Sequence, residues 1–232
     1  MKRVNAPELM DGAPLPPAIM RDALWFLALS NRWFGGTGVI LRRLEAWSGR
    51  WDPGREITIL DAGTGAADIP VAIAAWADRR GFRVRITAAE LVPEAAAVAR
   101  DRTKGVPAIE VVQADVFALL AGGGVFDFVI ASLFLHHMPP DRHSPVLQAF
   151  DRAARRGVIV SDLGRSAAGY AAVWLLAHAA GNRVVRHDGP LSVRRAFTIS
   201  ELDALARGAG LPYLRAAREP WFRVSLAGEK TP

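Results

Sequence analysis

Between residues 56 and 161, short apolar runs alternate with segments of helical periodicity, and this alternation constrains the fold more than any other feature. Strands are predicted at residues 57–60, 83–88, 109–113, 126–131 and 158–161, and helices at 69–79, 93–103 and 144–154. A strand that follows a crossover helix pairs parallel to the strand before it, through a right-handed connection. The sequence therefore predicts a doubly wound α/β domain around a mostly parallel sheet.

The beginning of the chain departs from this rhythm. Residues 1–20 show little periodicity and are predicted to form a loose arm. Two short amphipathic helices are expected after it, at 23–29 and 39–47. Together these segments predict an N-terminal arm and helical cap over residues 1–52.

The end of the chain departs from the rhythm as well. A long segment at 163–197 is followed by one predicted helix, 200–208, and two apolar runs at 213–218 and 221–226. A Glu-Pro pair between these runs favours a tight return of the chain. We therefore expect seven strands with an antiparallel last strand, in one main domain, 53–232, that carries a helical insertion at 163–197.

Composition sets broad limits on function. With 51% hydrophobic residues, the 232-residue chain has material for one globular core. No apolar run approaches the roughly 20 residues that span a bilayer, and the N-terminus is a poor signal peptide, so a cytoplasmic protein without a transmembrane segment is expected. The absence of cysteine excludes disulfides and cysteine-ligated zinc, and no metal is predicted. The net charge of +6 raises nucleic acid or an acidic membrane as partner, but the scattered arginines favour a solvated basic surface over nucleic acid.

A loop of small residues follows the first predicted strand: Asp61-Ala62-Gly63-Thr64-Gly65-Ala66-Ala67-Asp68. Ligands of open α/β sheets bind beyond the carboxyl ends of strands, where small residues let a nucleotide-type ligand approach the backbone. Asp68 stands where a dinucleotide site needs glycine or alanine, and no P-loop lysine follows. A ligand without phosphates, with a sulfonium and an ammonium group, suits these carboxylates better. S-adenosylmethionine is such a ligand.

Acidic residues also follow the second and third predicted strands. Glu90, followed by Leu91, is placed to accept both hydrogens of a ribose diol. Asp115 is placed to accept from an adenine amino group, while Val116 flanks the ring. Each acid alone is also a common cap or turn residue, but three acids at successive strand ends favour one ligand site. The candidate cofactor-binding residues are Asp61, Gly63, Thr64, Gly65, Asp68, Glu90, Leu91, Asp115, Val116 and Ser132.

Over residues 55–165 the chain resembles the class I S-adenosylmethionine-dependent methyltransferases. The segments that carry the resemblance are Ile59-Leu60-Asp61-Ala62-Gly63-Thr64-Gly65, Glu90-Leu91-Val92-Pro93-Glu94, Ala114-Asp115-Val116, and Phe126-Asp127-Phe128-Val129-Ile130 followed by Leu135-His136-His137. Asn31-Arg32 and Gly65-Ala66-Ala67-Asp68-Ile69-Pro70 are similar to the quinone-biosynthesis branch. The chain departs from the family at Ala67, often a third glycine, and at Glu90, often aspartate. The resemblance implies a Rossmann-like methyltransferase fold, S-adenosylmethionine as cofactor, and an acceptor pocket built by the insertion.

Methyl transfer from a sulfonium requires an aligned acceptor, exclusion of water and, for some acceptors, removal of a proton. His136 and His137 follow the fourth predicted strand at the ligand edge of the sheet. An imidazole is a suitable base for a phenol or an enolisable carbon. We expect His137 to be the general base and His136 to be a second candidate, with a packing or capping role as the alternative for each.

The insertion supplies the candidates for an acceptor pocket. Its first half, 167–180, is apolar almost all round and must be covered. Covering by the helical cap, which carries Trp25, Trp33 and Phe34, predicts an aromatic-lined cavity for a flat hydrophobic acceptor. The polar second half is placed to hold an acidic group of the acceptor or to supply another base. The candidate pocket residues are Trp33, Tyr170, Trp174, Arg186 and His187.

The leading functional hypothesis is methylation, at oxygen or carbon, of a small hydrophobic acceptor such as a phenol, a quinol or a polyketide-like molecule. One alternative is an RNA or protein methyltransferase. The Asn/Asp-Pro-Pro-aromatic tetrad of amino-group methylation is absent, since Ser132-Leu133-Phe134-Leu135 follows the fourth strand. Another alternative is a non-catalytic S-adenosylmethionine-binding module that supports a partner enzyme. The oligomeric state is left open.

Overall fold

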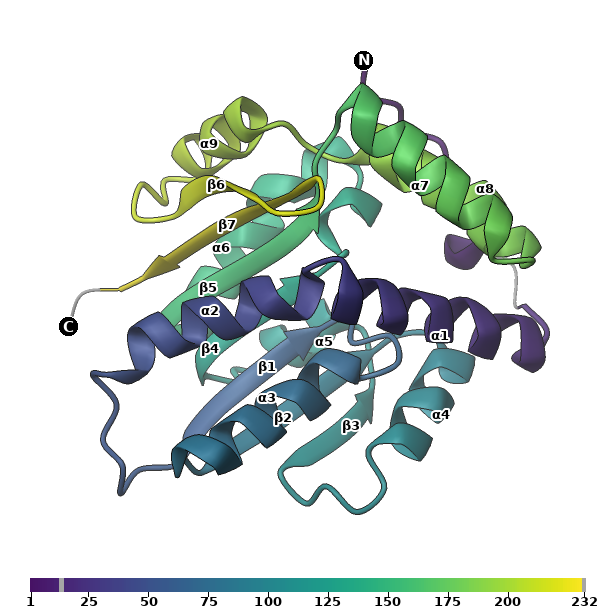
Figure 1. The fold of residues 1–232 in the computed structure, drawn as a ribbon. Coiled ribbons are helices and arrows are strands. Elements are labelled where there is room, and N and C mark those ends of the chain that lie inside the picture. The colour runs from purple at the N-terminus through teal and green to yellow at the C-terminus, as the bar shows by residue number, and fades with distance from the viewer. Residues whose placement is uncertain (13–14, 231–232) are drawn as a thin grey trace.

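The computed structural model describes residues 1–12 and 15–230, so that residues 13–14 of the predicted arm lie outside the described residues (Figure 1). The strands are β1 (Ile57–Ala62), β2 (Val84–Glu90), β3 (Ile109–Gln113), β4 (Phe126–Ser132), β5 (Ala154–Leu163), β6 (Arg215–Glu219) and β7 (Arg223–Glu229). They form one sheet in the order β3-β2-β1-β4-β5-β7-β6. β7 pairs antiparallel with both of its neighbours, and the other pairs are parallel. The predicted α/β fold with an antiparallel last strand is confirmed.

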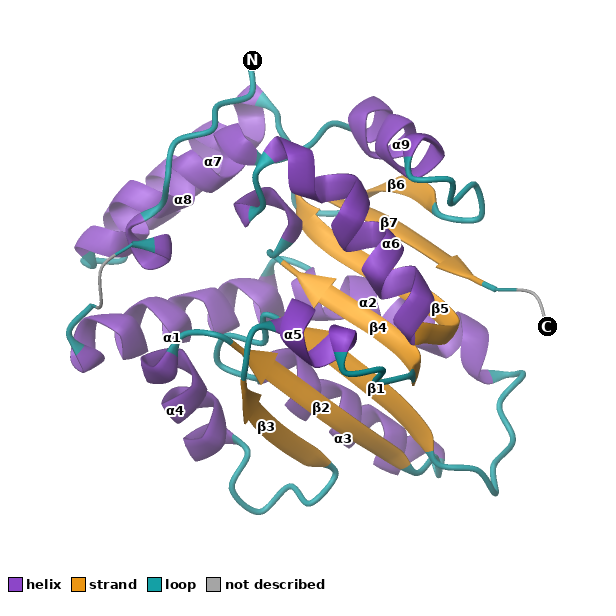
Figure 2. Ribbon diagram, turned by 180° about the vertical axis from the view of Figure 1, so that it is seen from behind, coloured by secondary structure: helices purple, strands orange, loops and turns teal. Residues whose placement is uncertain are grey.

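Helices cover both faces of the sheet. They are α1 (Pro17–Trp33), α2 (Gly36–Ser48), α3 (Asp68–Arg80), α4 (Pro93–Arg102), α5 (Val116–Ala121), α6 (His143–Ala153), α7 (Ala167–Ala179), α8 (Arg183–Arg195) and α9 (Ile199–Gly208), with short 3-10 helices η1 (Leu9–Asp11), η2 (Leu135–His137) and η3 (Pro140–Arg142). Figure 1 shows α2 and α3 in front of the sheet, and Figure 2 shows α5, α6 and α9 on the opposite face. No helix in the described part of the chain has the length and apolar character needed to cross a membrane.

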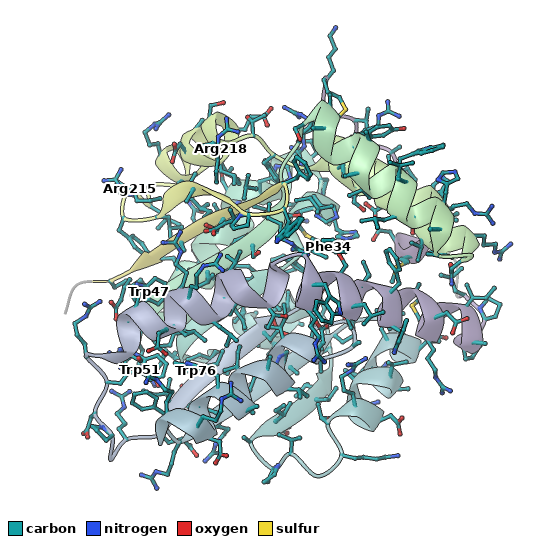
Figure 3. All side chains as sticks on the ribbon, viewed as in Figure 1. Phe34, Trp47, Trp51, Trp76, Arg215 and Arg218 are labelled. Atoms are coloured by element: carbon teal, nitrogen blue, oxygen red, sulfur yellow. The ribbon has the colours of Figure 1, made fainter. Side chains whose placement is uncertain are left out.

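The strands divide their side chains between two cores because successive residues of a strand point to opposite faces. In β1, Ile57 and Ile59 belong to the core under α2 and α3, whereas Leu60 and Ala62 belong to the core under α6 and α9. The first core ends in an aromatic cluster whose members Trp47, Trp51 and Trp76 are labelled in Figure 3. These two cores hold the carboxyl ends of the central strands in a fixed arrangement.

Residues 1–12 of the arm are held against α8, which contradicts the prediction of a loose arm for this part. Residues 1–12 lie along α8, where the backbone N–H of Val4 donates to the carbonyl of Arg194 at 3.1 Å. The backbone N–H groups of Leu9 and Met10 both donate to the carboxylate of Asp188, at 2.8 and 3.1 Å. Sequence periodicity did not reveal this order because long-range hydrogen bonds to α8 hold the arm in place.

The cap helices also differ from the prediction. α1 is 17 residues long and buries Met20, Ala23, Leu24, Ala28 and Asn31. Trp25 and Trp33 lie outside this buried stripe and are 59% and 65% exposed. The sequence predicts that both side chains help to enclose an aromatic-lined cavity, but on α1 they point away from the buried stripe and do not line the cavities described below.

Candidate active site

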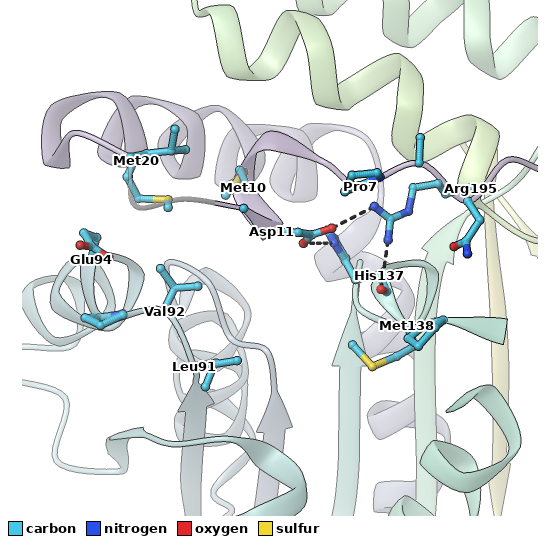
Figure 4. Close-up of a pocket in the computed structure, with 16 residues that line it drawn as sticks. Pro7, Met10, Asp11, Met20, Leu91, Val92, Glu94, His137, Met138 and Arg195 are labelled. Carbon is cyan, nitrogen blue, oxygen red and sulfur yellow. Dashed lines mark hydrogen bonds and ion pairs between the residues drawn. The ribbon is translucent and has the colours of Figure 1, made fainter. Parts of the chain in front are cut away.

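Two adjoining cavities, of about 380 and 620 Å³, lie beyond the carboxyl ends of β1, β2 and β4. The strand-end loops form the floor of the inner, smaller cavity, and α1, α7, α8 and the arm form its roof. Figure 4 shows the outer cavity, which shares Met10, Asp11, His137 and Met138 with the inner one. The position agrees with the rule that ligands of open α/β sheets bind at the carboxyl ends of strands.

The loop after β1 turns sharply so that its backbone faces the inner cavity. Gly63 and Gly65 have positive φ angles of 68° and 55°, and a Cβ on Gly63 would come within 2.5 Å of the ring of Phe134. Ala67 also has a positive φ, 55°, although it carries a side chain. This is the position where the resembled family often has glycine, so the departure noted in the sequence corresponds to backbone strain.

Asp61 lies under the loop and does not line the cavity. It is 2% exposed and accepts a hydrogen bond from Thr64 Oγ1 at 2.6 Å. Burial raises the pKa of Asp61 to about 7, and the nearby charges of Asp68 and Glu90 act in the same direction. The structure therefore places Asp61 where it orders the loop from below.

Asp68 begins α3 and faces the inner cavity. Its Oδ2 accepts from Asn31 Nδ2 at 3.1 Å, and Asn31 Oδ1 in turn accepts from Arg223 Nη2 at 2.9 Å. Arg223 of β7 also donates to the carbonyl of Phe34 and lines the cavity. Burial lowers the pKa of Arg223 to about 10. This chain of contacts ties the loop after β1 to β7.

Glu90 ends β2 and its carboxylate faces the inner cavity. Its Oε2 accepts from the backbone N–H of Gly65 at 2.8 Å, and its Oε1 accepts from that of Val92 at 3.0 Å. Asp115 caps α5 by accepting from the N–H of Phe117 at 2.8 Å, so the helix-cap alternative holds alongside its position in the cavity wall.

The structure brings the strand-end candidates together. Apart from Asp61, every candidate cofactor residue of the sequence analysis lines the inner cavity: Gly63, Thr64, Gly65, Asp68, Glu90, Leu91, Asp115, Val116 and Ser132. Ser132 Oγ is buried and has no hydrogen-bond partner among the described residues. A buried hydroxyl without a partner is costly unless a ligand satisfies it. The carboxylates and the serine hydroxyl that line the cavity therefore fit a ligand with a ribose, an amino-substituted base and a cationic end.

His136 is the buried imidazole of the cavity. It is 2% exposed, its Nδ1 lies 2.6 Å from Asp162 Oδ1, and its backbone N–H donates to Asp162 Oδ2. Burial acts to raise the pKa of Asp162, but the charge and hydrogen bond of His136 outweigh it, so that the pKa is lowered. A carboxylate on Nδ1 fixes the tautomer that presents the Nε2 lone pair to the cavity. That Nε2 is buried and makes no hydrogen bond among the described residues.

Glu8 of the arm faces this nitrogen from the roof. Its Oε1 lies 3.6 Å from His136 Nε2 and accepts from Ser192 Oγ at 3.0 Å. Burial raises the pKa of Glu8 to about 7, and the charges of His137 and Arg195 act against this increase. The roof thus contributes a carboxyl group to the end of the cavity where His136 lies.

Asp11 links His137 to Arg195, as the dashed lines in Figure 4 show. Its Oδ1 lies 2.7 Å from His137 Nδ1, and its Oδ2 accepts from Arg195 Nη1 at 2.9 Å. Burial acts to raise the pKa of Asp11, but the contacts with His137 and Arg195 outweigh it and lower the pKa to about 2. Arg195 also donates to the carbonyls of His136 and His137. His137 is therefore held by the arm, and it is less buried than His136.

One group of described residues has the donors of a metal site. Atoms of Glu8, His136 and His137 lie within 4.8 Å of one another. The Nδ1 atoms of both histidines are held by carboxylates, the arrangement found behind metal-bound histidines. Arg195 places a competing positive charge 3.7 Å from Glu8 Oε1.

The candidate pocket residues of the sequence analysis do not line either cavity. Trp33 and Trp174 are exposed, and Tyr170 lies on α7 away from the cavity wall. Arg186 and His187 are exposed on the outer side of α8. The same insertion lines the cavity with its opposite face. The lining side chains there are Val173, Val184, Val185, Asp188 and Ser192. The sequence predicted that the insertion lines a cavity, but not which side of its helices faces inward. A helix that is apolar all round gives no sequence signal of its inner face.

Sequence reasoning missed Glu8, Asp11, Asp162, Asp188 and Arg223 as candidate site residues. Asp162 has a recognisable signal, because it stands at the end of β5 as Glu90 stands at the end of β2. The others come to the cavity through contacts between segments far apart in the chain, which no local pattern reveals.

Comparisons with known proteins agree with this geometry. Residues 59–157 match the profile of the methyltransferase domain family. No curated protein matches the chain.

Similar solved structures include magnesium protoporphyrin IX methyltransferase from Synechocystis PCC 6803 with bound SAH, with TM-score 0.58 and 16% identity over 95% of this chain and 90% of that chain. A SAM-dependent methyltransferase from Aquifex aeolicus has TM-score 0.59 and 15% identity over 93% and 99%. The CMeT domain of the citrinin polyketide synthase has TM-score 0.59 and 15% identity over 80% and 49%. At these identities the likeness concerns the fold.

The sheet order, the strand-end cavity and the domain match define the class of the protein. The chain carries a methyltransferase domain in a Rossmann-like class I fold. The predicted resemblance to the class I S-adenosylmethionine-dependent methyltransferases is confirmed, and so is the prediction of an enzyme that transfers methyl groups. S-adenosylmethionine is the methyl donor of this class.

Proposed function

We propose that this methyltransferase transfers the methyl group of S-adenosylmethionine to an oxygen or carbon atom of a small, largely hydrophobic acceptor, which loses a proton to His136. The observation that carries the proposal is the buried pair of His136 and Asp162, whose Nε2 makes no hydrogen bond among the described residues and faces a cavity lined by both apolar and charged side chains. The apolar lining comes from Met10, Met20, Leu24, Phe26, Leu27, Val173, Val184 and Val185. Such a cavity suits a flat or elongated apolar molecule with one polar end.

The floor residues would hold the donor. Glu90 would accept from the ribose hydroxyls, Asp115 would accept from the adenine amino group, and Asp68 would lie near the cationic end. When bound, the sulfonium supplies a methyl group that needs no covalent catalyst. The contribution of the protein is therefore to align the acceptor, to exclude water and to take up the proton.

The roof residues would orient the acceptor. Glu8 and Ser192 would face its polar end, opposite His136. The bound cofactor would supply the methyl group, and His136 Nε2 would take up the proton that the acceptor loses on methylation. Asp162 stabilises the resulting imidazolium, because its carboxylate lies on Nδ1. The names of two structural neighbours, a magnesium protoporphyrin IX methyltransferase and a polyketide synthase CMeT domain, are consistent with a small acceptor.

Transfer of labelled methyl groups tests the proposal. The purified protein is incubated with methyl-labelled S-adenosylmethionine and a cell extract that has been separated into organic-soluble, RNA and protein fractions. We expect label in the organic-soluble fraction, where the product can be identified by its mass. Label in RNA or protein would overturn the proposed acceptor class. Absence of label in all fractions, with cofactor binding intact by calorimetry, would favour a non-catalytic module.

A further inference from the structure

α7 has an outer face that nothing covers in the described structure. The helix contains no Asp, Glu, Lys or Arg, and only Gly169 and Ala177 are buried in it. Leu175 is 63% exposed, and Trp174 and Leu176 are exposed beside it. A helix that is apolar all round is normally enclosed by protein or by lipid. The inner face of α7 packs on α8 and lines the cavity, whereas its apolar outer face is enclosed by neither.

The turn between β6 and β7 adds two aromatic side chains to this surface. Trp221 and Phe222 are 59% and 46% exposed and have positive φ angles of 61° and 58°. Bulky residues in this conformation cost free energy, and such strain is retained where it serves a function. Phe222 lies against Gly169 at the beginning of α7, where a Cβ would be 3.0 Å from Phe222 Cβ. Phe222 therefore joins the turn to the beginning of α7. We call the exposed apolar side chains of these two segments the aromatic face: Trp174, Leu175, Leu176, Trp221 and Phe222.

Positive charge accompanies the aromatic face. Between residues 164 and 198 the chain has five arginines, of which Arg183, Arg186 and Arg194 are exposed and the other two are ion-paired with Glu201 and Asp11. The one acidic residue of this segment, Asp188, is buried and bound to the arm. Arg183 and Arg186 are exposed on α8, the helix that packs on α7. Near the aromatic turn, Arg218 projects from the surface of β6 (Figure 3). Exposed tryptophan and leucine beside arginine, without exposed acids, are typical of helices that lie in the interface of anionic bilayers.

We propose that the aromatic face binds the surface of an anionic lipid bilayer, with Trp174, Leu175 and Trp221 in the headgroup region and the neighbouring arginines against lipid phosphates. A second copy of the chain is a poorer occupant, because face-to-face pairing would bring two sets of arginines together. The inner faces of α7 and α8 line the cavity with Val173, Val184 and Val185. The bilayer would thus lie against the outside of the acceptor-cavity roof. The proposal is independent of the proposed reaction, since neither cofactor nor acceptor takes part in binding.

Sedimentation with lipid vesicles tests this proposal on the full chain. We expect binding to vesicles of phosphatidylcholine and phosphatidylglycerol, weaker binding to pure phosphatidylcholine, and loss of binding as salt increases. Leu175→Glu should abolish binding. Arg183→Gln and Arg186→Gln should each weaken binding about fivefold, the effect of one cation near an anionic surface. The matched control is Val125→Glu, because Val125 is also exposed but lies at the amino end of β4, whereas α7 follows the carboxyl end of the parallel strand β5.

The outcomes separate the possible occupants. Absence of binding to anionic vesicles by the wild-type protein would overturn the proposal, as would equal binding by the Leu175→Glu and Val125→Glu proteins. Equal binding to neutral vesicles would overturn the role of the arginines. Size-exclusion chromatography of the same proteins completes the test. A wild-type dimer that Leu175→Glu converts to a monomer would identify a second copy as the occupant and overturn the proposal.

Discussion

The floor and the roof of the cavity are built in different ways. The floor is made by the loops that follow successive parallel strands: Glu90 binds the backbone of Gly65, 25 residues earlier, and of Val92, two residues later. The roof is made by residues that are far apart. Leu9 binds Asp188 across 179 positions, and Asp11 binds Arg195 across 184. The difference suggests a division of labour, in which the floor fixes the cofactor and the roof selects the acceptor.

Loss of His136, the proposed base at the junction of the two regions, should have the largest effect on turnover. His136→Gln removes the nitrogen that faces the cavity, so we expect kcat to fall about 10²- to 10⁴-fold, the contribution of a positioned general base. Cofactor affinity should remain unchanged, because the floor is intact. Asp162→Asn should lower kcat as well and alter its pH profile, since it disturbs the tautomer of His136. Steady-state kinetics and calorimetry measure both quantities.

A matched control for this variant is His178→Gln. His178 is exposed on α7 and stacks on Trp174, outside both cavities. Its substitution should leave kcat unchanged. If His136→Gln retained the wild-type rate while His137→Gln lost it, the base would be His137, as the sequence analysis expected.

Substitution of a floor residue should weaken binding of the cofactor. Glu90→Ala removes a carboxylate that faces the cavity and also holds the N–H of Gly65. We expect the Kd for S-adenosylmethionine to rise roughly 10- to 100-fold, the range for hydrogen bonds to a charged group. Isothermal titration calorimetry measures the change, with Glu110→Ala on the exposed edge strand β3 as control. Equal affinity of the wild-type protein for the 2′-deoxy cofactor would contradict the ribose role of Glu90.

The contrast between floor and roof also explains what could be predicted from the sequence. Alternating apolar runs predicted the strands, and the strand-end rule then predicted nine residues that line the cavity, from Gly63 to Ser132. That rule works because parallel strands bring their carboxyl ends to one edge. The roof has no such rule. Glu8 and Asp188 meet through the tertiary packing of the arm on α8, and the uniform apolarity of α7 conceals which face is internal.

Substitution of a roof residue should leave cofactor binding by the floor unchanged. Asp188→Asn weakens the hydrogen bonds from the backbone of Leu9 and Met10 that hold the arm. We expect faster limited proteolysis of residues 1–12 and a several-fold higher KM for the acceptor, with an unchanged Kd for the cofactor. His187→Gln is the control, because it removes only a neighbouring contact of Asp188. A changed cofactor Kd without a change in proteolysis would refute the division between floor and roof.

The buried acid of the floor predicts a pH dependence of stability. The folded-state pKa of Asp61 is raised to about 7, above its ordinary value of 3.8. The folded protein therefore binds more protons than the unfolded chain between these values, and this group makes stability fall as pH rises from about 4 to 7. Thermal unfolding at pH 5 and pH 8 measures the effect. Asp61→Asn should flatten the dependence, whereas an identical slope in both proteins would show that Asp61 is already ionised at pH 5.

The smallest expected effect comes from the strained alanine of the floor loop. Ala67→Gly removes a Cβ from a residue with φ of 55°, so we expect stabilisation by roughly 0.5–1 kcal/mol after the entropy of the more flexible unfolded chain is subtracted. The control is Ala66→Gly, which lies next to it without a positive φ and loses a buried methyl group. That variant should be destabilised. Chemical denaturation measures the change in the free energy of unfolding for both variants. Changes of opposite sign would show that backbone conformation, and not packing, distinguishes position 67. Destabilisation of both variants would mean that the buried methyl group of Ala67 outweighs its strain, and that the loop gains rigidity from the alanine.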